Sequence, residues 1–326
     1  MALDFNQLKE TLESLNLSLG AGKVFFVCPG TDAWSSDLIG LQKVSGQVHG
    51  SLQAGLDACT SGRGDTVIVL PGTYTHASAT LSMSKSNVTL MALNNQQDQT
   101  LINTGMLDDD VAVGFPTVTV TGAGCTIKGF SLANGWYVAG PAANQPTLNV
   151  QASYFTVENC LFTYDGGNEG LGKYGVYCDG AANNLSLKVI GCTFDNCVTG
   201  GAAIYFDCAD ASGGTYRNPH IVDCHFVGVN KNDDNNWCIA ATADDDDNSI
   251  FGMLIKDCVF DPSGTGGGGG EDMLNLINAG DGDYEGVVVG CIFGCAYDAG
   301  SIGNVGGTLR FVKCYGQGGL STGQPA

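Results

Sequence analysis

Two aspartates could form the paired carboxylates that general acid–base chemistry requires. Asp223 and Asp257 hold the same place in two similar segments, IVDCHF and IKDCVF. If these segments stack as neighbouring strands, the two carboxyl groups lie about 5 Å apart, near the separation used by retaining glycosidases. The same position also suits a tight corner, because Asp accepts a left-handed backbone at low cost. We therefore predict a structural corner, with catalysis by this pair as the alternative.

A run of four aspartates offers ligands for a metal ion. Asp244, Asp245, Asp246 and Asp247 follow one another in the segment TADDDDNS. Carboxylate oxygens are the ligands that Ca²⁺ prefers. The run lacks the spacing of an EF-hand, however, and runs of like charge are usually solvated loops. Calcium is therefore a candidate ligand, and we expect no other cofactor.

Fourteen cysteines could bind zinc or form disulfides, but their spacing indicates another role. No pair has the C-x₂-C spacing of a zinc site. Six of them recur at intervals of 32, 32, 34, 33 and 23 residues. Because reduced cysteines pack as small apolar side chains, we predict a column of stacked core thiols. Its members are Cys160, Cys192, Cys224, Cys258, Cys291 and Cys314.

The residues around these cysteines predict the elements that position them. An apolar residue such as Val157 stands three residues before each Cys, and Phe stands two residues after five of the six. These two positions are an odd number apart, so strand alternation buries both only if the chain turns a corner between them. Asn, Asp or Gly precedes five of the six cysteines and suits that corner. The repeat predicts an all-β, parallel β-solenoid of about eight or nine turns.

The ends of such a coil need covers, because open sheet edges recruit other strands. Apolar residues at alternating spacings of three and four, from Phe5 to Leu19, predict an amphipathic helix over 1–22 that caps or attaches the fold. A first strand and a short helix (Ser51 to Cys59) are expected over 23–62. The β-solenoid follows over 63–318, and 319–326 forms a C-terminal tail.

Charge narrows the range of partners. The chain has 33 acidic and 13 basic side chains, for a net charge of −20. Such a field repels phosphate backbones and anionic lipids, so we expect no nucleic-acid partner. No apolar run approaches the ~18 residues of a membrane span, and the acidic start is unlike a secretory signal. We expect no membrane insertion and synthesis in the cytosol.

The segment GDTVIVLPGTY, Gly64 to Tyr74, follows SLQAGLDACTSGR and precedes SNVTL. Over residues 48–93 this arrangement resembles the first turn of right-handed parallel β-helices of the pectate-lyase-like superfamily, and the repeat extends the resemblance over 86–315. The resemblance implies a right-handed coil. The opening KVFFVCPGTD, Lys23 to Asp32, is also similar to β-helix proteins of tailed bacteriophages, which are virion components. This second resemblance implies a structural role in a phage particle.

Enzymes of this superfamily cut acidic polysaccharides, and the resemblance implies which residues they would need. Lyases use an Arg as base, and Arg217-Asn218-Pro219 matches the start of an Arg-x-Pro element. Val222 stands where a second Arg is expected, and the hydrolase motifs are absent from the sequence. If the chain is an enzyme, Asp223, Asp257 and Arg217 are its candidate catalytic residues.

The position two residues before each stacked Cys is expected to face outward, yet four of its six members are apolar. An apolar strip on the flat face of a rod is typical of a protein contact, unless a loop covers it. Related virion β-helices associate side by side, which implies a homotrimer that also contacts other virion proteins. The predicted interface residues are Ile190, Val222, Val289 and Val312.

These observations favour a non-enzymatic structural protein of a bacteriophage virion, either a capsid decoration protein or a head or tail accessory protein, assembled in the host cytoplasm. The first alternative is a polysaccharide lyase or glycoside hydrolase that acts on acidic polysaccharide, as phage depolymerases do. The second alternative is a carbohydrate-binding module. A host-surface polysaccharide is a candidate partner.

Overall fold

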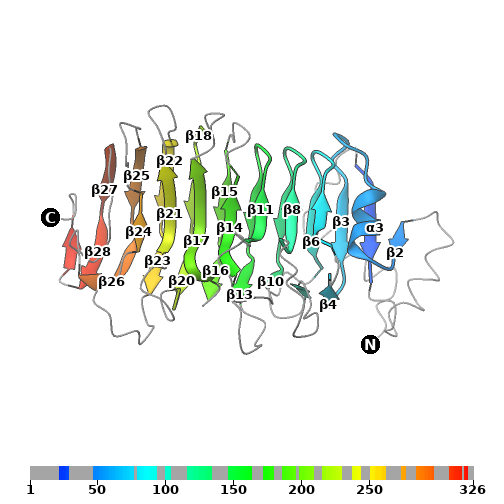
Figure 1. Cartoon of the computed structure of the whole chain (residues 1–326), viewed down its shortest axis with the longest axis horizontal. Coiled ribbons are helices and arrows are strands. Elements are labelled where there is room, and N and C mark those ends of the chain that lie inside the picture. Colours follow the sequence, from blue (N-terminus) through cyan, green and yellow to red (C-terminus); the bar gives the residue numbers. More distant parts are fainter. Residues whose placement is uncertain are drawn as a thin grey trace.

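The computed structural model describes residues 22–28, 47–76, 79–93, 100–103, 116–133, 146–163, 172–179, 186–195, 198–208, 215–229, 237–243, 250–261, 273–276, 284–296, 308–317 and 319–321. These residues form a parallel β-solenoid in which three sheets run along a rod, from the helix α3 (Leu52–Asp57) toward β28 (Figure 1). The predicted all-β parallel coil is confirmed. Its number of turns and the helix over 1–22, which lies outside the described residues, stay predictions.

Sheet A has twelve described strands that follow the rod in the order of the chain, except that β2 lies outside β1 and that β18 pairs only with β22. Its strands are β2 (Val48–His49), β1 (Val24–Val27), β3 (Thr66–Val69), β6 (Thr89–Ala92), β9 (Thr126–Lys128), β12 (Thr156–Glu158), β15 (Lys188–Ile190), β18 (Tyr216–Arg217), β19 (His220–Val222), β22 (Ile250–Lys256), β25 (Tyr284–Val289) and β27 (Thr308–Val312).

Sheet B has ten described strands and follows sheet A after a corner in each turn. Its parallel strands are β4 (Gly72–Thr75), β7 (Thr100–Asn103), β10 (Ser131–Ala133), β13 (Leu161–Thr163), β16 (Thr193–Asp195), β20 (His225–Val227), β23 (Val259–Asp261), β26 (Ile292–Ala296) and β28 (Cys314–Gln317). The last strand, β29 (Gly319–Ser321), pairs antiparallel with β28 and so ends the parallel series of this sheet.

Sheet C has seven described strands and completes the coil. They are β5 (Leu81–Met83), β8 (Val118–Val120), β11 (Pro146–Val150), β14 (Gly172–Cys178), β17 (Val198–Cys208), β21 (Trp237–Ala243) and β24 (Leu274–Asn275). Each pairs in parallel with the strand of the next turn, so residues in equivalent places form columns along the rod.

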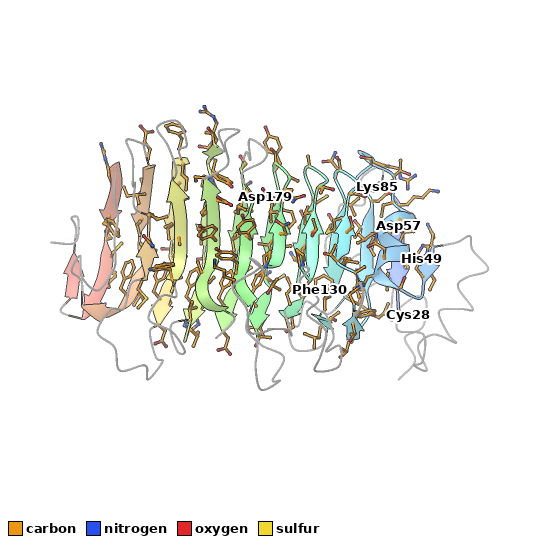
Figure 2. All side chains as sticks on the ribbon, viewed as in Figure 1. Cys28, His49, Asp57, Lys85, Phe130 and Asp179 are labelled. Atoms are coloured by element: carbon orange, nitrogen blue, oxygen red, sulfur yellow. The ribbon has the colours of Figure 1, made fainter. Side chains whose placement is uncertain are left out.

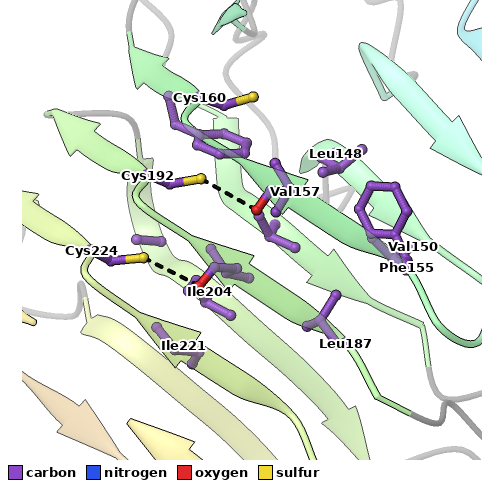
Figure 3. Packing of buried hydrophobic residues seen from close by; sticks show 14 of the residues in the cluster. Leu148, Val150, Phe155, Val157, Cys160, Leu187, Cys192, Ile204, Ile221 and Cys224 are labelled. Carbon is purple, nitrogen blue, oxygen red and sulfur yellow. Dashed lines mark hydrogen bonds between the residues drawn. The ribbon is translucent and has the colours of Figure 1, made fainter. Parts of the chain in front are cut away.

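The core consists of such columns. The predicted Phe column is stacked face to face, with ring centroids 4.6 to 5.0 Å apart and planes within 8° of parallel, from Phe162 to Phe293. The six predicted cysteines are fully buried beside it, and the twelve cysteines of the described chain are free thiols. Each Sγ of the column donates to a carbonyl of the preceding turn, as from Cys192 to Val157 at 3.7 Å (Figure 3). The column is therefore held by packing and weak hydrogen bonds.

The corner between sheets A and B adopts the predicted left-handed backbone. The φ angles are +54° at Asp223 and +52° at Asp257, and Gly290 in the next turn has +69°. A Cβ atom placed on Gly290 would lie 2.3 Å from Oδ1 of Asp257, so that carboxylate occupies the space above the glycine of the following turn. Asn159 lies over Gly191 in the same way. At these two places a side chain at the corner lies over a glycine of the following turn, which makes room for it.

The helix α3 packs against β1, β2, β3 and β5 at the first described turns, which confirms the helix predicted there. Ser51 is its N-cap, and the Ser51 hydroxyl accepts a hydrogen bond from the Ala54 amide. Nearby, Asp65 is completely buried but fully bonded: it accepts from the Arg63 guanidinium and from the amides of Thr60 and Lys23. This network closes the coil at its N-terminal end.

Candidate functional site

The carboxylates predicted for catalysis lie at corners. Asp223 and Asp257 directly follow the paired residues Val222 and Lys256, and the Asp223 amide donates to the Lys256 carbonyl, so the two aspartates are neighbours along the rod as predicted. Both side chains are exposed, and both residues need a positive φ that Asp tolerates. Arg217 is in β18, six residues before Asp223. Its guanidinium carbon lies over the Phe251 ring, 5.3 Å from the ring centre. The structure does not bring the three together.

The other predicted sites are the metal site of the four aspartates and the apolar interface. Asp244, Asp245, Asp246 and Asp247 lie outside the described residues. In the part of the chain that is described, no three His, Cys, Asp or Glu side chains gather as they would around a metal ion. The predicted interface residues Ile190, Val222, Val289 and Val312 lie in one column on the outer face of sheet A, with Lys256 between Val222 and Val289.

A different group of side chains has the geometry of a binding site, on the outer face of sheet C. Tyr177 of β14 and Tyr205 of β17 are each followed two residues later by an aspartate, which is Asp179 directly after β14 and Asp207 within β17. The pairing of Tyr177 with Tyr205 and of Cys178 with Phe206 sets these two pairs one above the other. Figure 2 shows Asp179 near the middle of the rod.

A backbone irregularity adds two more aromatic residues to this face. Gly175 and Val176 are both buried, and a Cβ on Gly175 would approach the Phe194 ring to 3.2 Å, so the alternation of faces is broken between Tyr174 and Tyr177. Tyr174 is thereby placed on the outer face, in register with Ala202 and then Trp237.

The four aromatic residues form one cluster with small residues beneath them. The Tyr177 and Tyr205 rings are parallel with centroids 5.7 Å apart, and the Tyr174 ring lies 4.4 Å from that of Tyr205. Tyr174 is only 3% exposed, whereas Tyr177, Tyr205 and Trp237 remain half-buried. We call Tyr174, Tyr177, Tyr205 and Trp237 the aromatic platform.

Polar groups line one side of the aromatic platform. The Tyr177 hydroxyl donates to Asp207, and Gln151 Nε2 donates to Oδ2 of Asp179 at 2.7 Å. Burial raises the pKa of Tyr177 far above its usual value, and Asp207 raises it further by accepting its proton in a hydrogen bond. Burial and the neighbouring Tyr205 raise the pKa of Tyr174 in the same way. The tyrosine hydroxyls therefore stay protonated as donors beside two carboxylates.

The platform also carries an acceptor that the described protein leaves unused. Asn149 stands next to Tyr177 in register, one turn earlier on β11. Its Oδ1 is buried from solvent and has no hydrogen-bond partner among the described residues. A buried polar atom without a partner costs about 1–3 kcal/mol. The cation near the platform is Lys173, whose Nζ lies 5.3 Å from the centre of the Tyr174 ring.

Apolar ring surface with hydroxyl, carboxylate and amide groups at its edge is the mixture that recognises a ligand with both C–H faces and hydroxyl groups. The sequence contains a signal for it, because the segments VYCDG and IYFDC repeat Tyr-x-Asp at a spacing of 28 residues. None of the four aromatic residues was predicted from the sequence as functional.

No family model matches the chain, and no curated protein matches it in sequence. Solved structures do match. YbhC of Escherichia coli superposes with a TM-score of 0.52 at 11% identity, covering 94% of this chain and 79% of that one. The pectin methylesterase of Aspergillus niger gives 0.50 at 14% identity, covering 90% and 84%. The chain is a right-handed parallel β-helix.

A protein described as ORF18 of Geobacillus virus E2 gives a TM-score of 0.49 at 17% identity. The match covers 88% of this chain and 60% of the viral one. At these identities the matches establish the β-helix fold and no activity. In the described part of this β-helix, no helix is long and apolar enough to cross a bilayer.

Proposed function

We propose that this β-helix is a non-catalytic structural protein of a bacteriophage particle that binds a saccharide on the aromatic platform of sheet C. The observation that carries the binding role is the Tyr177–Asp207 contact beside the Tyr205 ring. It combines apolar surface with charged acceptors in one place, on a rigid sheet. The particle role is supported by the similarity of Lys23 to Asp32 and of residues 48–93 to phage β-helices.

The chemistry of the platform favours a neutral or amino sugar over an acidic one. Asp179 and Asp207 accept hydrogen bonds from hydroxyl or ammonium groups, and hydrogen bonds to charged acceptors contribute about 1.5–3 kcal/mol. A uronate would bring a third carboxylate to these two on a chain of net charge −20. We therefore replace the acidic polysaccharide of the sequence-based alternative with a neutral or amino-sugar polymer.

The test is affinity electrophoresis of the full chain in gels that contain dextran, mannan, chitosan oligomers or polygalacturonate. We expect retardation by a neutral or amino-sugar polymer, and none by polygalacturonate. Tyr177→Phe removes only the hydroxyl that donates to Asp207, and should weaken binding about tenfold, the equivalent of 1.4 kcal/mol. Tyr315→Phe is the matched control, because this tyrosine is 47% exposed on sheet B. Equal binding by the two variants, or retardation by none of the polymers, contradicts the proposal.

A hydrolytic role at the same place is the second candidate, and the carboxylates favour it over the predicted Asp223 and Asp257. Asp179 and Asp207 occupy equivalent places on neighbouring strands, about 5 Å apart along the rod, which is close to the retaining separation. Reducing ends released from a retarding polymer, and lost in both Asp179→Asn and Asp207→Asn, would establish this enzyme. Release of none supports a purely binding role.

A further inference from the structure

The outer face of sheet A has an unusual composition over β15, β19, β22, β25 and β27, which follow one another in the sheet. Two columns of outward residues run across these strands, and every adjacent pair within each column is in register. One column reads Lys188, His220, Leu254, Val287 and Arg310, and the other reads Ile190, Val222, Lys256, Val289 and Val312. We call these ten residues the docking face.

Six of the ten side chains are apolar although they point away from the core. Inward neighbours such as Ile221 and Val288 are completely buried, whereas Val222 and Val289 are half-buried and Val312 is 39% exposed. Alternation along each strand therefore leaves an apolar strip on the outer face of the sheet, which Leu254 and Val287 continue beside Lys256. A monomer usually scatters such residues, and a contiguous strip marks a contact surface.

The charges on the docking face oppose those of the rest of the chain. Three of its remaining members are basic, none of the ten is acidic, and the whole chain has a net charge of −20. The nearest ion pair, between Lys256 Nζ and Asp257 at 3.3 Å, joins two exposed side chains at the corner that borders the face. Because acidic side chains outnumber basic ones by 33 to 13 over the whole chain, a second copy carries an excess of negative charge outside its own docking face.

We propose that the docking face binds a second copy of this chain, through a heterologous contact with that copy's acidic surface. Two identical docking faces would bring the basic residues Lys188, Lys256 and Arg310 of one copy close to those of the other with no acidic partner on either face, and like charges at a contact are unfavourable. A contact between unlike surfaces avoids this and closes into a ring when the rotation permits. The homotrimer predicted from the sequence is one such ring. This proposal does not depend on saccharide binding.

The experiment measures the assembly of the full chain by sedimentation velocity at micromolar concentrations. We expect an oligomer whose dissociation constant rises with salt, because screening shortens the Debye length from about 10 Å at 0.1 M to about 3 Å at 1 M. Val222→Asp should weaken assembly at least tenfold. Its matched control is Val259→Asp, which makes the same change at a half-buried outward valine of sheet B.

A second variant separates charge from apolar contact. Lys188→Glu combined with Arg310→Glu changes two exposed side chains at the border of the strip and leaves the apolar residues in place. It should weaken assembly and abolish its dependence on salt. Circular dichroism of each variant excludes unfolding as the cause. A wild-type chain that stays monomeric overturns the proposal, as does a loss of assembly that is equal in Val222→Asp and Val259→Asp.

Discussion

Substitution of Asp223 distinguishes a corner residue from a catalytic one. Its φ of +54° costs an ordinary L-residue about 1–2 kcal/mol, costs Asp or Asn less, and costs Gly nothing. Gly pays instead about 0.5–1 kcal/mol of additional backbone entropy on folding. Asp223→Gly should therefore change the free energy of unfolding by less than about 0.5 kcal/mol, while Asp223→Ala should lower it by about 1 kcal/mol.

Asp195 is the matched control, because it is also an exposed aspartate, but lies in strand β16 without a positive φ. There Gly should be the worse substitution, since a strand gains nothing from its freedom and loses about 0.5–1 kcal/mol relative to Ala. The rank of Gly and Ala should thus reverse between the two sites. Urea unfolding midpoints at constant m-value give the comparison. If Gly is worse than Ala at Asp223 as well, the corner explanation is wrong.

Two further predictions concern stability. Phe226 is stacked between Phe194 and Phe260 and is completely buried, so Phe226→Ala should lower the free energy of unfolding by about 3–5 kcal/mol. Phe251→Ala removes a half-buried ring and should lower it much less. Equal effects of the two substitutions in urea unfolding would argue against the stacked column. Burial raises the pKa of Asp65, but hydrogen bonds from Arg63, Thr60 and Lys23 outweigh it and lower the pKa to about 2. This depressed pKa means that the carboxylate stabilises the fold above its ordinary pKa near 4, and that this contribution is lost as the pH falls toward 2. Asp65→Asn should therefore destabilise the chain at pH 7 and have little effect at pH 2, and a pH-independent difference in unfolding midpoint would contradict this.

The core was predictable because the residues that form it are spaced within a few positions of one another in each turn. An apolar residue at Val157 and a Phe at Phe162 enclose Cys160 at a spacing that strand alternation alone cannot bury, so a corner had to lie between them. The corner in turn explains why Asp223 and Asp257 are aspartates. The sequence of a single turn contains all of this information, and the full pattern occurs five times in the chain.

The aromatic platform was not predictable by the same reasoning. Tyr174 and Tyr177 are three residues apart, so alternation places them on opposite faces, and only the irregularity near Gly175 brings them together. Arg217 and Asp223 show the reverse case: they are close in sequence, but the turn at Asn218, with a φ of +53°, separates them. Irregular backbone is set by packing between turns, which a one-dimensional pattern does not contain.

The near-equal spacing of the corners makes each turn a module with matching ends. Excision of residues 193–224 would join Cys192 to His225 and place Phe226 over Phe162, where Phe194 stood, with every column still continuous. Duplication of the same stretch would lengthen the rod without altering any neighbour. Evolution can therefore shorten or lengthen this rod by deleting or duplicating whole turns, while the cross-section of the coil stays the same.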